Sequence, residues 1–302
     1  MGYLPKPGVG FELIEFRSNG RDVQGGIFSP DPKRFKPSAT AIVLVHGVES
    51  YWYSAPTMFM GCLFAEAGYT VLGYNGVHSG DTFRTSEFDT AVSEAGDAVA
   101  FMSSRGFDRI FLVGHSLGTP IVEYYQGDKP HPSVKALGVY GPHIDIPAVT
   151  RDSLLGPELY EQFAHECREL VAAGRGDELR LLPFREGKFV ITSAKTFLSY
   201  RDVKTSKANV EKSIGNITVP FLIVYDDGDN IQGKGTITRR ATIAARLKEK
   251  AVNSPRADVV VIPSSPGNSS FQAHLFVNNE KLVVAKTVAW LETVGLPPAA
   301  RY

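Results

Sequence analysis

The chain has 302 residues, of which 43% are hydrophobic and 21% are charged. This length and composition are typical of a globular protein with a large core and exclude a disordered chain. Lysine plus arginine and aspartate plus glutamate number 32 each, so no net charge attracts nucleic acid or an anionic membrane. The two cysteines are too few for a disulfide framework. We recognise no secretory signal and no apolar run long enough to cross a membrane, and we expect a cytoplasmic protein.

The first third of the sequence predicts a hairpin followed by alternating strands and helices. Asn19-Gly20 is typical of a two-residue turn between antiparallel strands. The aliphatic run 41–45 is typical of a strand buried on both faces of a parallel sheet. The predicted strands are 10–17, 22–28, 41–45 and 69–74, and the predicted helices are 56–67 and 87–105.

The remaining sequence continues this alternation, with one interruption. No buried parallel strand is recognisable between His143 and Val219, and much of that stretch has helical spacing, including a helix at 159–172. Elsewhere the predicted strands are 109–113, 134–140, 220–225 and 257–262, and the predicted helices are 120–125, 236–250 and 280–293.

Alternating buried strands and helices predict an α/β fold with a mostly parallel sheet of about eight strands, flanked by helices and begun by an antiparallel hairpin. Residues 1–142 and 220–302 form the predicted core domain. Residues 143–219, the inserted segment, lie between sheet strands 6 and 7, and we expect them to form a mainly helical cap. A second, independent domain is the alternative, which the short length and the lack of linkers disfavour.

The most informative motif is Gly114-His115-Ser116-Leu117-Gly118, directly after the strand at 109–113. It fits the G-x-S-x-G pattern, in which a serine sits on a sharp turn between a strand and a helix. Glycines flank the serine because a Cβ there would collide with neighbouring backbone. The sequence therefore predicts Ser116 as a nucleophile, with an ordinary serine in a strand-to-helix turn as the alternative.

These residues resemble the α/β-hydrolase family over 40–142 and 220–293. The resemblance implies the α/β-hydrolase fold and a catalytic order of nucleophile, acid and histidine. It also implies an oxyanion hole formed by two backbone N–H groups, one from Leu117 and one from Val48 in the His46-Gly47-Val48 turn. We expect His46 to orient this turn and not to take part in catalysis.

The resemblance places the acid after the strand ending at Tyr225. In the family a glycine follows this strand and the acid comes three residues later; here Asp226 occupies the glycine position and Asp229 that of the acid. Asp226 and Asp227 remain alternatives. The base is expected between the last strand and the closing helix, where His274 is the one histidine beyond residue 165.

Substrate-binding residues are less clearly marked. The sequences 170–178 and 196–199 resemble the cap of a hydrolase group that includes esterases of siderophores, although a glycine-capped helix with solvated charges explains them equally well. Candidates near the pocket are Glu49, Tyr51, Trp52 and His143.

The sequence thus predicts a serine hydrolase that cleaves a carboxylic ester or lactone of a small or medium-sized metabolite through an acyl-enzyme at Ser116. Hydrolysis of carbon–carbon bonds in β-diketone-like substrates is the alternative, and thioesters and amides remain open. A ligand-binding protein without turnover is the alternative from another class. We expect a small-molecule substrate, no cofactor, no metal, no nucleic acid and no membrane partner; a homo-oligomer remains open.

Overall fold

A computed structural model describes residues 8–183, 189–231 and 238–302. Eight strands form one sheet in the order β1-β2-β4-β3-β5-β6-β9-β10. The first two pair antiparallel, β2 pairs antiparallel with β4, and the strands from β4 to β10 are parallel. The strands are β1 Gly10–Ser18, β2 Arg21–Ser29, β3 Thr40–Val45, β4 Thr70–Tyr74, β5 Arg109–His115, β6 Val134–Tyr140, β9 Phe221–Asp226 and β10 Ala257–Ile262. The predicted fold class is confirmed.

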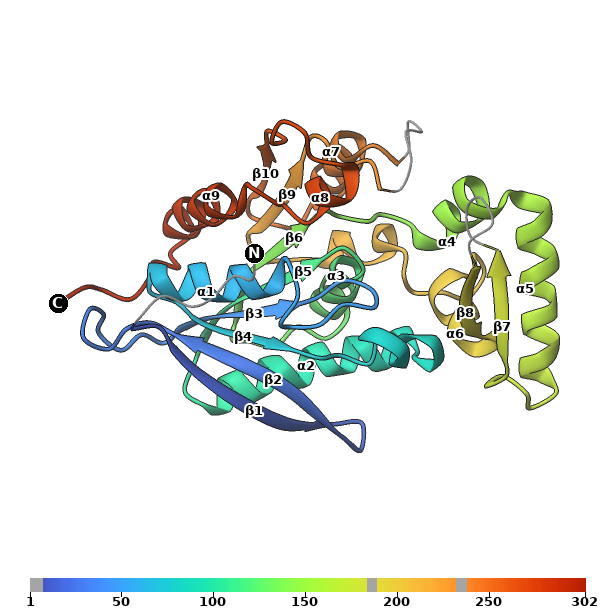
Figure 1. Cartoon of the computed structure of the whole chain (residues 1–302), viewed down its shortest axis with the longest axis horizontal. Helices are drawn as coiled ribbons and strands as arrows, with labels where there is room; N and C mark the ends of the chain where they lie inside the picture. The colour runs from blue at the N-terminus through green and yellow to red at the C-terminus, as the bar shows by residue number, and fades with distance from the viewer. Residues whose placement is uncertain (1–7, 184–188, 232–237) are drawn as a thin grey trace.

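Helices cover both faces of this sheet, so its central strands are buried throughout (Figure 1). One core cluster lies between the sheet and α2, α3 and α7, and a second lies between the sheet and α1 and α9. This explains why β3 and β9 consist of continuous apolar runs. The helices are α1 Thr57–Ala67, α2 Phe88–Ser104, α3 Gly118–Asp128, α7 Arg240–Lys250 and α9 Glu280–Thr293.

Residues 143–201 of the inserted segment lie beyond the carboxyl ends of the parallel strands, at the right of Figure 1, whereas Val210, Ile214 and Ile217 pack in the large core beside α3. The segment contains its own small apolar cluster, in which Phe163 and Phe197 meet edge to face with ring centroids 4.9 Å apart. Its elements are α4 Ile146–Val149, a π-helical turn Thr150–Leu155, α5 Pro157–Ala172, β7 Leu179–Pro183, β8 Phe189–Ser193, α6 Ala194–Arg201 and two 3-10 turns, Val210–Lys212 and Ile214–Asn216.

The antiparallel pair β7–β8 departs from the mainly helical segment that the sequence predicts. Only Leu182 and Val190 turn toward the apolar cluster, whereas Leu181 and Phe189 are exposed. Five-residue strands with apolar residues on both faces lack the polar alternation by which a half-buried strand is recognised.

Two further boundaries differ from expectation. The helix predicted from Thr236 begins at Arg240, and residues 236 and 237 lie outside the described residues. His274, expected in a loop, ends the short helix α8 Ser270–His274, which Ser269 and Gln272 begin with a capping box. In the part of the chain that the structure describes, no helix combines the length and the apolarity needed to span a bilayer.

Candidate active site

Ser116 occupies the turn between β5, which ends at His115, and α3, which begins at Gly118. Its φ of 53° lies in the left-handed region, which non-glycine residues adopt only where the surroundings impose it. A Cβ on Gly114 would lie 2.3 Å from the carbonyl oxygen of Gly118, and one on Gly118 would lie 2.3 Å from that of Val45. The flanking glycines are therefore required by backbone packing, as the motif predicts.

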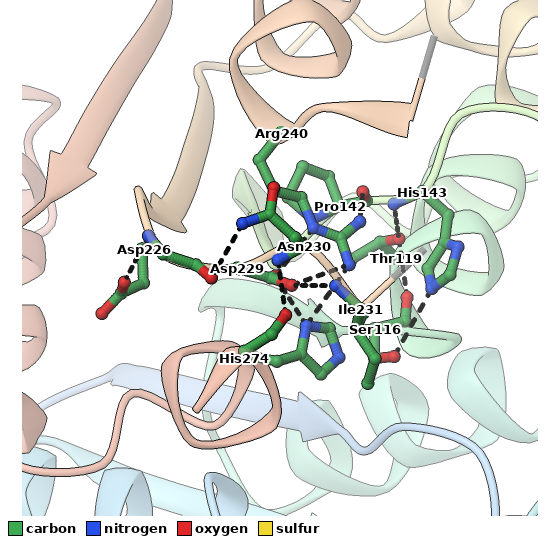
Figure 2. A network of polar contacts seen from close by, with 12 residues as sticks. Ser116, Thr119, Pro142, His143, Asp226, Asp229, Asn230, Ile231, Arg240 and His274 are labelled. Carbon is green, nitrogen blue, oxygen red and sulfur yellow. Dashed lines mark hydrogen bonds and ion pairs between the residues drawn. The ribbon is translucent and has the colours of Figure 1, made fainter. Parts of the chain in front are cut away.

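His274 and Asp229 are both buried and in direct contact (Figure 2). The distance from His274 Nδ1 to Asp229 Oδ2 is 2.7 Å. With Nδ1–H donating to the carboxylate, Nε2 keeps its lone pair and can accept a proton. Asp226 instead accepts from the Gly228 N–H and the Asn279 amide, and Asp227 accepts from the Ser264 N–H. Of the three aspartates, Asp229 is the one that contacts His274.

Arg240 is a second partner of Asp229 that sequence reasoning missed. Its Nε lies 2.7 Å from Asp229 Oδ2, and its Nη1 donates to the Pro142 carbonyl. Burial alone would raise the pKa of Asp229, but hydrogen bonds and charges from His274 and Arg240 outweigh it and lower that pKa. No sequence signal marks Arg240, because Arg239-Arg240 at a helix start is equally consistent with two solvated side chains.

The His274 ring is held from two sides. The His115 Nε2–H donates to the His274 carbonyl at 2.9 Å, and the two rings lie 4.7 Å apart. Gly141, with φ 57°, faces the ring so closely that a Cβ there would lie 2.9 Å from His274 Nδ1. Burial lowers the pKa of His274. The hydrogen bond to Asp229 and the charge of Asp229 raise this pKa, and the charge of Arg240 lowers it. The net result is a pKa below the usual 6.5. The imidazole is thus neutral at pH 7.

The Ser116 hydroxyl faces His143, whose Nε2 lies 3.5 Å from Oγ (Figure 2). Thr119 fixes this arrangement, because its hydroxyl donates to the Ser116 carbonyl and accepts from the His143 N–H. Burial lowers the pKa of His143 well below 6.5, and Arg240 and His274 add to this lowering. Among the described contacts none joins Ser116 Oγ to His274.

The turn after β3 lies against Ser116, and a Cβ on Gly47 would be 3.0 Å from Ser116 Cβ. The backbone N–H groups of Val48 and Leu117 donate no hydrogen bond within the described residues, and both residues line the same cavity as Ser116. Free donors at this position are what an oxyanion requires.

His46 holds the turn from behind. Its Nδ1 lies 2.6 Å from the Gly47 carbonyl, so Nδ1 carries the proton and Nε2 accepts from the Gly76 N–H. The Ser79 hydroxyl, which donates to the Gly76 carbonyl, lies 2.9 Å from the same Nε2. Burial lowers the pKa of His46 to about 4. These contacts are those of a residue that orients the loop.

A cavity of about 170 Å³ opens beside Ser116. Residues of the turn at Ser116 and of the turn after β3 line it together with residues of the inserted segment, including Tyr200 and Arg201. The lining residues are Val48, Phe83, Ser116, Leu117, His143, Ile146, Val149, Thr150, Leu154, Tyr200, Arg201 and Ile231. Of the four pocket candidates named from the sequence, His143 is among them.

The other three candidates lie elsewhere. Trp52 is buried against Phe11 and Phe28, so its ring fills the core and does not reach the cavity. Tyr51 stacks on the ring of Tyr53 with centroids 5.0 Å apart. The carboxylate of Glu49 faces Arg84 at 3.9 Å. The sequence could place these residues in the correct loop but could not give the direction of their side chains.

No cluster of potential metal ligands occurs within residues 8–183, 189–231 and 238–302.

No family model and no curated protein matches this sequence. Solved structures do match. A structure of Est1E from Butyrivibrio proteoclasticus with ferulic acid bound shares 16% identity at a TM-score of 0.67, over 93% of this chain and 98% of that chain. The siderophore hydrolase EstB from Aspergillus fumigatus shares 14% identity at a TM-score of 0.68, over 96% and 99%.

This chain has the α/β-hydrolase fold. A carboxyl esterase from Bacillus coagulans shares it at a TM-score of 0.66 and 15% identity, over 94% of this chain and 98% of that chain. At these identities the likeness concerns the fold, and the chemistry has to be argued from the site itself.

Proposed function

We propose that the protein is a serine hydrolase that cleaves a carboxylic ester or lactone of a small or medium-sized metabolite. The observation that carries this proposal is the 2.7 Å contact between His274 Nδ1 and Asp229, at a site where Ser116 stands on a positive-φ turn. The fold shared with proteins described as esterases and as a siderophore hydrolase supports it.

In the proposed reaction the Ser116 hydroxyl turns from His143 toward His274, whose Nε2 removes the proton as Oγ attacks the carbonyl carbon. Asp229 stabilises the imidazolium that forms. The N–H groups of Val48 and Leu117 donate to the developing oxyanion. His274 then protonates the leaving alcohol, and a water deprotonated by His274 releases the acyl group.

His143 binds substrate next to the nucleophile in this proposal. Its lowered pKa keeps the ring neutral, so Nε2 offers a hydrogen bond and no positive charge. The inserted segment acts as a cap, because Ile146, Val149, Leu154 and Tyr200 give the cavity a largely apolar wall. Such a wall suits the hydrocarbon part of a substrate.

Labelling with a fluorophosphonate probe tests the nucleophile. The folded protein should label, and Ser116→Ala should not label at all. His274→Ala should label at least about 100-fold more slowly, because general-base catalysis contributes roughly 10²–10⁴-fold. A folded wild-type protein that does not label would refute the proposal and favour a ligand-binding protein.

Measurements of turnover then identify the type of bond that the protein cleaves. Short p-nitrophenyl esters should be hydrolysed by the wild-type protein and not by Ser116→Ala. A panel of β-diketones serves as the comparison, since a carbon–carbon hydrolase would use the same three residues. Faster cleavage of the β-diketones than of any ester would replace ester hydrolysis by that alternative.

A further inference from the structure

Arg201 contributes a positive charge to the wall of the cavity that contains Ser116. It is the last residue of α6, and it lines this cavity together with Tyr200. The position is partly buried. Nothing in the sequence distinguishes Arg201 from an ordinary basic residue in the last turn of a helix.

The guanidinium makes no ion pair with any described residue. Its Nη1 donates to Thr150 Oγ1 at 2.9 Å, and the Thr150 hydroxyl in turn donates to the Ile146 carbonyl. Glu49 attracts Arg201 only from a distance, because its carboxylate faces Arg84. By contrast, the buried Arg240 is paired with Asp229, and Arg168 is paired with Asp202.

The surroundings of Arg201 make an uncompensated charge costly. Phe83, Val149 and Leu154 share the cavity wall with it. Burial lowers the pKa of Arg201 to about 10, so the side chain is still a cation at neutral pH. A guanidinium has five N–H donors in a planar fork that fits a carboxylate with two parallel hydrogen bonds. Thr150 takes one of these donors and thereby fixes the side chain.

We propose that Arg201 binds a carboxylate group of the substrate, so that the protein acts on esters that carry one negative charge at a distance from the scissile carbonyl. This inference rests on the proposed function and specifies its substrate class. One cation in an apolar wall matches one anion, and the apolar side chains between Arg201 and Ser116 contact the hydrocarbon that joins the two groups.

Matched ester pairs test this inference. In the first pair, mono-p-nitrophenyl adipate and its methyl ester at the far carboxyl differ only in the charge on the acyl side. In the second pair, p-butyryloxybenzoate and its methyl ester differ in the charge on the alcohol side. The wild-type protein should favour the anionic member of at least one pair in kcat/KM, mainly through a lower KM.

Arg201→Gln should lower kcat/KM for the favoured anionic ester by roughly 10- to 100-fold, the range for losing a hydrogen bond to a charged group. Activity on the neutral partner should change less than about threefold. Arg201→Lys should restore part of the preference, because it keeps the charge without the fork. Thr150→Val should weaken the preference in the same direction. Arg175→Gln, which removes an exposed cation of the inserted segment that does not line the cavity, is the matched control and should leave the preference intact.

Two results would overturn the inference while leaving the proposed function in place. In one, neutral and anionic esters are hydrolysed equally well. In the other, Arg201→Gln lowers activity equally on both members of a pair, as expected of a purely structural role. If the wild-type protein neither labels with fluorophosphonate nor hydrolyses any ester, the proposed function fails and this inference fails with it.

Discussion

At the scale of single residues, Arg240 distinguishes this site from a serine, histidine and aspartate acting alone. It places a buried positive charge on the carboxylate that holds His274. Because this charge opposes formation of a second cation, Arg240 contributes to the lowered pKa of His274. The arrangement favours a neutral base at mildly acidic pH.

We expect Arg240→Gln to move the acid limb of the pH profile of kcat/KM to higher pH, because the positive charge of Arg240 lowers the pKa of His274. In the wild-type protein, kcat/KM falls only when the pH drops through the lowered pKa of His274 and the imidazole becomes protonated. In the variant the imidazole becomes protonated sooner. The profile with a p-nitrophenyl ester measures this shift.

Arg239→Gln is the control, since Arg239 is exposed beside Arg240 and should leave the profile unchanged. Thermal unfolding of both variants has to accompany the measurement, because breaking a buried ion pair can cost about 3–5 kcal/mol of stability. An acid limb that stays in place, or moves to lower pH, in folded Arg240→Gln would contradict the assigned role.

The sequence predicted Ser116, Asp229 and His274 as site residues because each follows a recognisable strand at a fixed place in the chain. It could not identify Arg240 or Arg201 as site residues. Their roles depend on contacts with Asp229 and Thr150, which the fold brings near from distant parts of the sequence. Local patterns carry no information on such contacts.

At the scale of elements, the turn between β5 and α3 is under backbone strain at Ser116, with φ 53°. We expect Ser116→Gly to be more stable than Ser116→Ala by about 0.5–1 kcal/mol, because glycine has no Cβ to clash in this conformation. The extra backbone entropy that glycine loses on folding offsets part of this advantage. Both variants lack the nucleophile, so the comparison isolates the strain.

Thermal and urea unfolding of the two variants measure this difference. Equal stabilities, or a more stable alanine variant, would show that the turn is not strained by the side chain. The result bears on function, because a strained turn that persists must be imposed by the neighbouring packing of Gly47 and Gly118.

The regular elements of the large sheet were predictable, and those of the inserted segment were not. β6 and β10 match their predicted ranges because each contains an apolar run, which is buried in β6 and half-exposed in β10, the edge strand of the sheet. β7 and β8 were missed because their apolar residues lie on both faces of a two-stranded sheet. α8 was missed because five residues are too few for helical periodicity to show.

At the scale of the whole molecule, apolar burial is unevenly divided. The two core clusters on the large sheet contain most of the buried side chains, whereas the cluster in the inserted segment is small. Regions with few buried contacts open at lower free energy than the core. The cavity wall is joined to the large core, because Ile146 and Tyr200 belong to the first core cluster, whereas the small cluster packs behind α6.

We expect Phe197→Ala, which empties part of the small cluster at a cost of roughly 3–5 kcal/mol, to act locally. Amide hydrogen exchange should accelerate in α5, β8 and α6 while β3 and β5 keep their protection, and ester hydrolysis should fall. Phe221→Ala, in β9 of the large core, is the comparison and should accelerate exchange throughout the sheet. Equal effects of both variants on the sheet would show that the segment and the core unfold as one unit.

Five buried histidines in and beside the site also affect how the whole molecule responds to acid. Burial lowers the pKa of His46, His78, His115, His143 and His274 below 6.5. At these five residues the unfolded chain therefore binds more protons below pH 6.5 than the folded one does. The contribution of the neutral histidines to the stability of the folded state is fully present above pH 6.5. It is lost as pH falls toward the lowered pKa values.

Unfolding in mild acid is thus coupled to proton uptake. Each of these histidines adds up to about 1.4 kcal/mol per pH unit to the slope of stability against pH. Urea unfolding between pH 7 and pH 4.5 should show stability that falls with pH, although by less than five histidines alone would give, because burial raises the pKa of the Glu94, Glu123 and Asp145 carboxyls and these bind protons preferentially in the folded chain. The proton count is checked in weakly buffered solution, and an absence of net proton uptake on unfolding would contradict the role given to the histidines. Imidazoles in and beside the site thus contribute to the acidity that the fold can withstand.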